Sequence, residues 1–319
     1  MRNFIIHGDI IYSESVTKLV CRKNAYAVCE NGLCAGVYDR IPAKFAGYKV
    51  IDYTGRLVLP GMVDLHLHAP QYAYRGLGMD LELLEWLQTY AFFEEAKYSD
   101  LKYAKKAYGV FVRAMKKSAT TRAVIFATAH KDATILLMDM LDKTGIGAYV
   151  GKVNMDTDAP DNLREKDAKT SAEDTESWLD MVTGHYENCR PIVTPRFLPS
   201  CSHELMERLQ GIVEERKLPV QSHLSENPGE VELVHQLMPD SEFYGEGYAR
   251  FDLFGKRFYG FHHTNAVEQD SCAKRAGKCV AHSGFNIDVL KDIIEIQSSG
   301  KNGMNCRIIS VSDKFFKFR

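Results

Sequence analysis

Short apolar runs separated by turn residues mark the first 56 residues of the chain. The runs are rich in β-branched and aromatic residues and fall at Phe4–Ile6, Lys18–Cys21, Tyr26–Cys29 and Tyr48–Asp52. The pairs Asn31-Gly32 and Thr54-Gly55 are typical of turns. The pattern predicts a small antiparallel β domain over residues 1–56, which would form the N-terminal portion of an incomplete β-sandwich.

The rest of the chain alternates short apolar runs with longer segments of helical period, as is typical of βα units around a parallel sheet. Eight runs predict strands: Leu57–His66, Arg122–Ala127, Ala148–Val153, Ile192–Phe197, Pro219–His223, Phe258–His262, Lys278–His282 and Arg307–Asp313. Amphipathic helices are predicted between them: Leu81–Glu94, Leu101–Lys117, Ala133–Thr144, Ser171–Tyr186 and Glu204–Arg216. Because eight strands close a barrel, residues 57–319 are predicted to form an α/β fold, a TIM-like (β/α)8 barrel.

The last predicted strand leaves only six residues before the end of the sequence. A TIM-like barrel normally follows each strand with a helix. We therefore expect a barrel that lacks its last helix, as in a C-terminally truncated chain.

Composition narrows the class of protein. Of 319 residues, 45% are hydrophobic and 26% are charged, an ordinary balance for a globular protein. Forty Lys and Arg against 42 Asp and Glu give a net charge of −2, so nothing predicts a nucleic-acid partner. The eight cysteines form no Cys-x-x-Cys pair, and no apolar stretch is long enough for a secretion signal or a membrane helix. We expect a cytoplasmic protein that does not bind a membrane.

Two histidines stand two residues apart at the end of the first barrel strand. In an extended strand, residues i and i+2 point to the same side, so His66 and His68 can present both imidazoles to one point. His223 ends the fifth predicted strand and Asp313 ends the eighth. Because the C-terminal ends of barrel strands meet at one face, these four side chains are expected to converge. Three histidines and one aspartate predict an open, catalytic metal site, with Zn²⁺ as the first choice and iron as the second.

Two further residues are candidates for chemistry beside such a metal. Glu226 follows His223 by three positions, where a carboxylate can take a proton from a metal-bound water and pass it to a leaving group. The alternative is a solvated glutamate before the helix that Pro228 opens. His262 ends the sixth predicted strand, where it could hydrogen-bond the attacking hydroxide or the substrate; an ordinary core or surface histidine is the alternative.

Five segments carry a resemblance to a known family. They are PGMVDLHLHAPQY (60–72), LEWL (84–87), GKVNMD (151–156), TPRFLPSC (194–201) and HLSENPGEV (223–231). In these segments the chain resembles the guanine deaminases of the metal-dependent amidohydrolase superfamily, from about Leu57 to Asp313. The first segment is common to the superfamily, whereas GKVNMD, TPRF and HLSEN together are more specific.

The resemblance implies an activity and the residues that carry it. The reaction would be the zinc-dependent hydrolytic deamination of guanine to xanthine and ammonia, in purine catabolism, by a homodimer. The implied roles are metal ligation by His66, His68, His223 and Asp313, catalysis by Glu226 with His262 and Asp313, and purine contacts from Gln71, Arg196 and His262. A guanidinium and a carboxamide suit a flat polar purine, because together they donate and accept hydrogen bonds.

Other interpretations stay open. The substrate could be a different aminopurine, a pterin or a triazine, or the chain could be a truncated, non-catalytic relative. A cytidine-type zinc deaminase is excluded, because its His-x-Glu and Pro-Cys-x-x-Cys motifs are not assembled here. A phosphate-binding P-loop is also excluded, because residues 145–152 have a spacing one residue too long and Val153 replaces the Ser or Thr.

Overall fold

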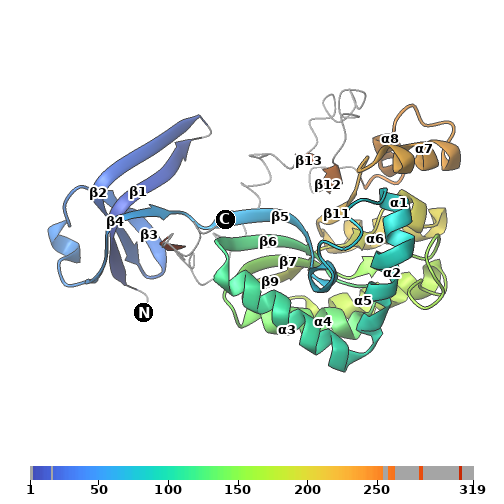
Figure 1. The fold of residues 1–319 in the computed structure, drawn as a ribbon, viewed down its shortest axis with the longest axis horizontal. Coiled ribbons are helices and arrows are strands. Elements are labelled where there is room, and N and C mark those ends of the chain that lie inside the picture. Colours follow the sequence, from blue (N-terminus) through green and yellow to red (C-terminus); the bar gives the residue numbers. More distant parts are fainter. Residues whose placement is uncertain (1–2, 16, 254–257, 263–279, 283–308, 311–319) are drawn as a thin grey trace. The chain divides into compact units, whose positions relative to one another are not determined.

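Two units make up the part of the chain that the structure describes (Figure 1). The computed structural model describes residues 3–15, 17–253, 258–262, 280–282 and 309–310, with the backbone alone from residue 258 onward. The first unit holds the described residues up to 63, residues 119–121 and residues 309–310. The second unit holds residues 64–118 and the described residues from 122 to 282.

The first unit is built on a five-stranded sheet in the order β14-β4-β1-β2-β3. Its strands are β1 (Phe4–Ser15), β2 (Lys18–Glu30), β3 (Leu33–Tyr38), β4 (Lys49–Leu59) and β14 (Ile309–Ser310), and a 3-10 turn, η1 (Ala43–Phe45), precedes β4. β1 and β2 form one antiparallel hairpin, and β2 and β3 form a second. Asn31 and Gly32 both have positive φ in the turn of the second hairpin, at the predicted position.

The prediction that this unit is purely antiparallel is wrong. β1 and β4 pair in parallel, with Phe4 opposite Lys49 and His7 opposite Asp52. The hydrophobic pattern identifies strands but does not show which of them become neighbours. The β2–β3 hairpin lies between β1 and β4 in sequence and acts as the crossover that a parallel pair requires.

The strands of the second unit form a curved parallel sheet. The described pairs β6–β7, β7–β9, β8–β10, β11–β12 and β12–β13 are all parallel. The strands are β5 (Met62–His68), β6 (Thr120–Phe126), β7 (Gly147–Gly151), β8 (Val153–Asn154), β9 (Cys189–Pro191), β10 (Thr194–Pro195), β11 (Val220–His223), β12 (Phe258–His262) and β13 (Val280–His282). The order is β5-β6-β7-β9, with β8 beside β10, and β11-β12-β13. A bridge between Val193 and Val220 links the β9–β10 segment to β11. The first seven predicted barrel strands therefore follow one another in order of sequence. The predicted start of the first at Leu57 is wrong, because Leu57–Leu59 belong to β4 of the first unit and β5 begins at Met62.

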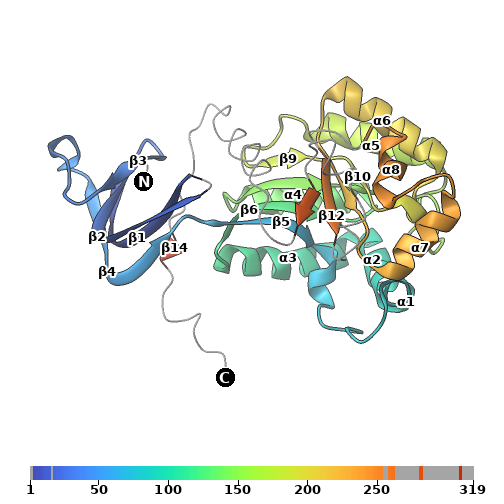
Figure 2. The same ribbon diagram turned by 90° about the horizontal axis from the view of Figure 1, so that it is seen from above.

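Helices connect these strands and lie along them (Figure 2). They are α1 (Leu83–Trp86), a π-helical turn η3 (Leu87–Ala91), α2 (Phe92–Ala96), α3 (Leu101–Lys117), α4 (Lys131–Asp142), α5 (Ala168–Val182), α6 (His203–Arg216), α7 (Pro228–Leu237) and α8 (Tyr244–Ala249). The described residues of this unit also contain three 3-10 turns: η2 (Pro70–Ala73), η4 (Lys97–Ser99) and η5 (Leu198–Ser200). α3 has the predicted bounds, and its N-cap Asp100 accepts a hydrogen bond from the Lys102 N–H at 2.8 Å.

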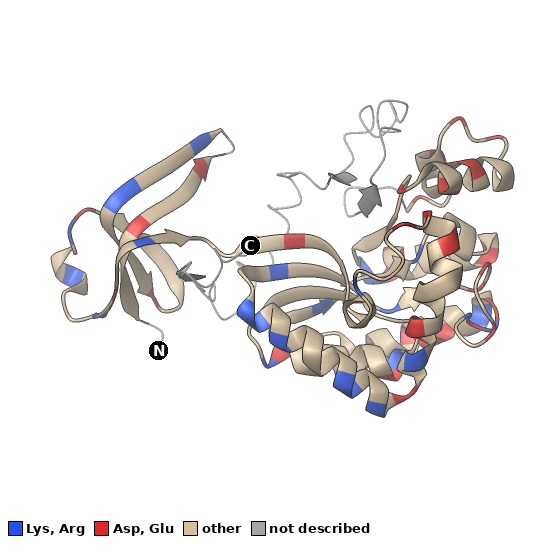
Figure 3. Ribbon diagram, in the orientation of Figure 1, with Lys and Arg blue, Asp and Glu red and all other residues tan. Residues whose placement is uncertain are grey.

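The main core of the second unit lies between these helices and the strands. Tyr108 on α3, Leu137 on α4, and Trp178 on α5 are fully buried in it. Figure 3 shows the lysines and arginines of α3 along a helix whose other face carries the apolar residues, as the helical period requires. Among the described residues, no helix has the length and hydropathy of a membrane span.

The eighth predicted strand, Arg307–Asp313, does not join this set in the described residues. Its described part, Ile309–Ser310, pairs antiparallel with Val58 and Leu59 of β4 in the first unit. The described part of the run is a strand, as predicted, but its assignment to the barrel is wrong. A run of two or three apolar residues fits any open strand edge, and the edge of β4 opposite β1 supplies one.

A substitution at Gly151 would test how tightly the strands are packed around the centre of the second unit. A Cβ at this position would lie 2.8 Å from the carbonyl oxygen of Ile192 and would collide with the Thr194 hydroxyl. We expect Gly151→Ala to lower the free energy of unfolding by about 1–3 kcal/mol, because neither the backbone nor the buried threonine can move away. Gly211 on α6 is the control: nothing lies within 4 Å of its added Cβ, so Gly211→Ala should stabilise by up to ~1 kcal/mol. Urea denaturation measures both, and equal stabilities would contradict this packing.

Candidate active site

Three histidines from two strands meet at one end of the second unit. His66 and His68 end β5 and His223 ends β11. One ring nitrogen of each lies within 4.8 Å of the others, and the Nε2 atoms of His68 and His223 are 2.9 Å apart. The structure thus brings together three of the four residues that the sequence predicts as metal ligands.

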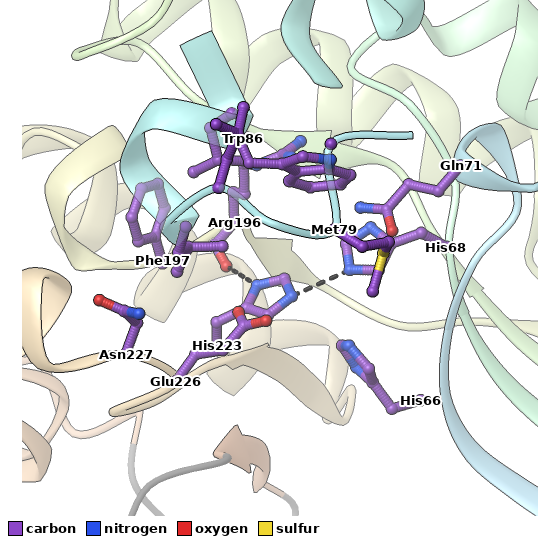
Figure 4. A pocket seen from close by; sticks show the side chains of 14 residues that line it. His66, His68, Gln71, Met79, Trp86, Arg196, Phe197, His223, Glu226 and Asn227 are labelled. Carbon is purple, nitrogen blue, oxygen red and sulfur yellow. Dashed lines mark hydrogen bonds between the residues drawn. The ribbon is translucent and has the colours of Figure 1, made fainter. Parts of the chain in front are cut away.

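The hydrogen bond of His223 sets which ring nitrogen faces the cluster. Its Nδ1 lies 2.6 Å from the carbonyl oxygen of Arg196, which can only accept, so Nδ1 carries the proton. The lone pair is then on Nε2, which points toward Nε2 of His68 (Figure 4). Two lone pairs at this distance repel unless a proton or a cation lies between them. A backbone carbonyl that orients an imidazole in this way is the usual partner of a metal-binding histidine, and the donor set therefore fits a divalent ion.

The surroundings of His68 and His223 favour the neutral imidazole that a metal requires. Burial lowers the pKa of His68 well below its usual value, and the neighbouring histidines and Arg196 lower it further. Burial also lowers the pKa of His223, although the negative charge of Glu226 opposes the shift.

Phe126 packs against all three imidazoles from the end of β6. Its ring centroid lies 4.5 Å from that of His68, 4.6 Å from that of His223 and 5.2 Å from that of His66. The ring of His68 stacks on it with an interplanar angle of 20°. An apolar ring at this position restricts the rotation of the histidines and excludes water from one side of the cluster.

A cavity of about 370 Å³ opens beside the histidines, a size that suits a small planar molecule. Its apolar walls include Trp86, Leu87 and Phe197, and its polar groups include Gln71, Arg196 and Glu226. Figure 4 shows Gln71 near His68 and the Glu226 carboxylate beside the ring of His223. The complete lining is His66, His68, Gln71, Gly78, Met79, Leu81, Leu83, Trp86, Leu87, Arg196, Phe197, His223, Glu226 and Asn227.

Arg196 is held in the wall of this cavity by a buried carboxylate. Its two terminal nitrogens donate to Glu95 at 2.5 and 3.1 Å, and both side chains are almost fully buried. Burial opposes the charge of Arg196, but the attraction of Glu95 outweighs it and raises the pKa of the guanidinium. The guanidinium also lies 5.1 Å from the ring centroid of Phe92. Because Glu95 takes two of the five guanidinium N–H groups, the others are left for further partners.

Glu226 lies in the loop between β11 and α7. Pro228 opens α7 as predicted, and Asn227 caps it by accepting from the Gly229 N–H at 2.8 Å. The backbone N–H of Glu226 donates to Glu230 at 2.7 Å. The Glu226 carboxylate is therefore presented to the cavity from a short loop that is bonded on both sides.

Two predicted site residues are described incompletely or lie outside the description. His262 ends β12, and its backbone stands one residue beyond Phe261, the partner of His223 in the parallel register. The backbone of His262 thus lies at the same edge of the sheet as His223. The description of His262 does not include its side chain. Asp313 lies outside them altogether.

Sequence reasoning missed Glu95, Phe126 and Glu230. Glu95 follows Phe92 by three positions, on the buried face of its helix, where an acid needs a partner. Glu230 follows the N-cap Asn227 by three positions, which is the spacing of a capping box. Both signals were present in the sequence. Phe126 has no signal beyond its place at a strand end.

Comparison with known proteins places the chain in a family. Residues 57–306 match the model of the amidohydrolase family. The guanine deaminase of Dictyostelium discoideum is 39% identical over 69% of this chain and 49% of its own length. The guanine deaminase of Homo sapiens is 38% identical over 75% of this chain and 55% of its own length. The chain thus spans about half the length of these relatives.

Solved structures support the same fold. The guanine deaminase of C. acetobutylicum, solved with guanine bound in its active site, superimposes with a TM-score of 0.83 and 42% identity. The match covers 92% of this chain and 72% of that one. The second unit accordingly has a TIM-barrel-like α/β fold built on a parallel sheet.

The buried ion pair of Arg196 and Glu95 should contribute to the stability of the fold. We expect Glu95→Gln to lower the free energy of unfolding by about 3–5 kcal/mol, because it leaves the buried Arg196 charge without its counter-ion. The adjacent Glu94, which pairs with Lys97 near the surface, is the matched control, and Glu94→Gln should cost less than about 1 kcal/mol. Denaturant titration of both variants measures the difference, and similar losses for the two would contradict a special role for the buried pair.

Proposed function

The chain belongs to the amidohydrolase family, and we propose that it catalyses the hydrolytic deamination of guanine to xanthine and ammonia. The observation that carries the proposal is the cluster of His66, His68 and His223 at a cavity that also contains Glu226. The similarity to guanine deaminases, one of them solved with guanine bound, supports this choice of substrate.

The three histidines would hold one divalent metal ion. We propose Asp313 as the fourth protein ligand on the resemblance to guanine deaminases alone, because the described strand before it, Ile309–Ser310, pairs with β4. Zn²⁺ is our first choice because imidazole and carboxylate ligands with one open position are typical of catalytic zinc, and iron is the second. When bound, such an ion lowers the pKa of a water molecule and so supplies a nucleophile at neutral pH.

Glu226 would move the proton. In the net reaction, the oxygen of water bonds to the ring carbon that bears the exocyclic amine, and the bond from that carbon to the amine nitrogen breaks. Glu226 accepts a proton from the water and delivers it to the departing nitrogen, which leaves as ammonia. The position of its carboxylate beside His223, in the lining of the cavity, supports this role (Figure 4).

The cavity walls would orient the ring. Arg196 donates to the carbonyl oxygen of the purine, and the Gln71 carboxamide both donates and accepts at the ring edge. Trp86 and Phe197 offer apolar surface to the faces of the flat ring. His262 would bond the attacking oxygen or the substrate.

Two further expectations belong to the same proposal: the chain forms a homodimer and is located in the cytoplasm. Light scattering of the purified chain tests the first of these.

Loss of guanine absorbance on addition of the zinc-loaded chain tests the function directly. We expect Glu226→Gln to retain one metal ion per chain and to lower turnover by at least about 100-fold, because it removes the proton carrier alone. The control is Glu232→Gln, an exposed glutamate of the neighbouring helix α7, which should leave both values unchanged. Turnover of a pterin or a triazine but not of guanine would overturn the substrate, and less than one metal per chain would favour a non-catalytic protein.

A further inference from the structure

Glu230 is a buried carboxylate that the proposed reaction does not use. It lies in the first turn of α7 and has no exposed surface. Oε1 accepts from the hydroxyl of Tyr244 at 2.5 Å, and Oε2 accepts from the backbone N–H of Glu226 at 2.7 Å. Both of these donors are neutral. Burial raises the pKa of Glu230 to about 7, although the hydrogen bond from Tyr244 opposes the shift. A carboxylate that is costly to bury requires an explanation.

The backbone around Glu226 explains why such a contact is needed. Ser225, just before it, has the left-handed φ of +53°, a conformation that residues other than glycine rarely adopt. Asn227, just after it, is fixed as the N-cap of α7. The turn between strand and helix is therefore sharp, and it persists only where neighbouring groups hold it. The hydrogen bond to Glu230 ties down the backbone N–H of the residue at its centre.

Helix α8 braces the same loop at two points. Tyr244 bonds Glu230, and Tyr248 donates to the carbonyl oxygen of His223 at 2.7 Å. The two tyrosine rings are stacked with centroids 6.1 Å apart, and both are buried. The two tyrosines thus hold the loop on both sides of Glu226: Tyr248 bonds His223 before it, and Tyr244 bonds Glu230 after it.

We propose that Glu230 is a positioning residue, which with Tyr244 fixes the backbone of Glu226 so that the Glu226 carboxylate faces the three-histidine cluster. The inference rests on the proposed role of Glu226 as the proton carrier. Glu230 does not touch the cavity and acts only through Glu226. Its loss therefore affects the chemical step and leaves metal binding, which depends on His66, His68 and His223, in place.

The test replaces Glu230 by methionine, a residue of similar size whose thioether sulfur is only a weak hydrogen-bond acceptor. We expect Glu230→Met to lower kcat for guanine by about 10- to 100-fold, with KM and the metal content unchanged. Glu230→Gln keeps an acceptor for the Glu226 N–H and should recover most of the lost kcat. Glu232→Met, the same change at an exposed site two residues away on α7, should leave kcat unchanged.

Two further measurements separate positioning from a general structural effect. When Glu230→Met is combined with Glu226→Gln, kcat should fall by less than about twofold below that of Glu226→Gln alone. Glu230 acts through the Glu226 carboxylate, which is already absent in that variant. Amide hydrogen exchange of the segment 223–227 should become faster in Glu230→Met than in the wild-type chain. This second measurement does not depend on activity.

Three results would contradict the positioning role of Glu230. Wild-type kcat in Glu230→Met, a loss of metal in that variant, or a further large loss in the double variant would overturn it. Should Glu230→Met fail to fold, Tyr244→Phe decides: we expect a smaller fall in kcat with metal retained, and an unchanged kcat refutes the inference. If the wild-type chain does not deaminate guanine, the proposed function fails, and unchanged hydrogen exchange would then also refute the positioning role.

Discussion

The hydrogen bond from His223 Nδ1 to the carbonyl oxygen of Arg196 is the interaction on which the site depends. It fixes the tautomer of His223, turns the Nε2 lone pair toward His68, and joins the end of β11 to the segment that follows β10. The backbone N–H of His223 also donates to this carbonyl, at 3.2 Å. One peptide group thus places both the imidazole and the start of the loop that carries Glu226. The side chain of Arg196, held by Glu95, lines the cavity, so two parts of one residue serve the cluster and the cavity.

The charged side chains around the cavity differ in how deeply they are buried and in what they contact. Arg196 is paired with Glu95, so it adds little net positive charge beside a cluster that is proposed to hold a cation. Glu226 is partly exposed to the cavity, whereas Glu230 is enclosed and bonded. The two carboxylates thus have different surroundings, as expected if Glu226 faces the reacting groups while Glu230 holds the backbone, the roles that we propose for them.

Local patterns in the sequence predicted much of the fold and the centre of the candidate site. The alternation of runs gave α3 its bounds, and the His66-x-His68 spacing placed two imidazoles on one side of a strand. Contacts between distant segments were harder to predict. The partner of Ile309–Ser310 is β4, which no local pattern specifies. Glu95 pairs with a residue 101 positions away, and only the burial of both side chains shows why an acid occupies that helix face.

The position of the histidines links the site to the curvature of the sheet. β5 and β11 are not adjacent, because β6, β7 and the β9–β10 segment lie between them in order. The Nε2 atoms of His68 and His223 can approach to 2.9 Å only because the sheet curves and returns one strand end toward the other. These residues are 155 positions apart, so the unfolded chain rarely brings them together. A ligand that requires all three imidazoles therefore binds the folded sheet far better than the unfolded chain, and its binding energy stabilises that curvature.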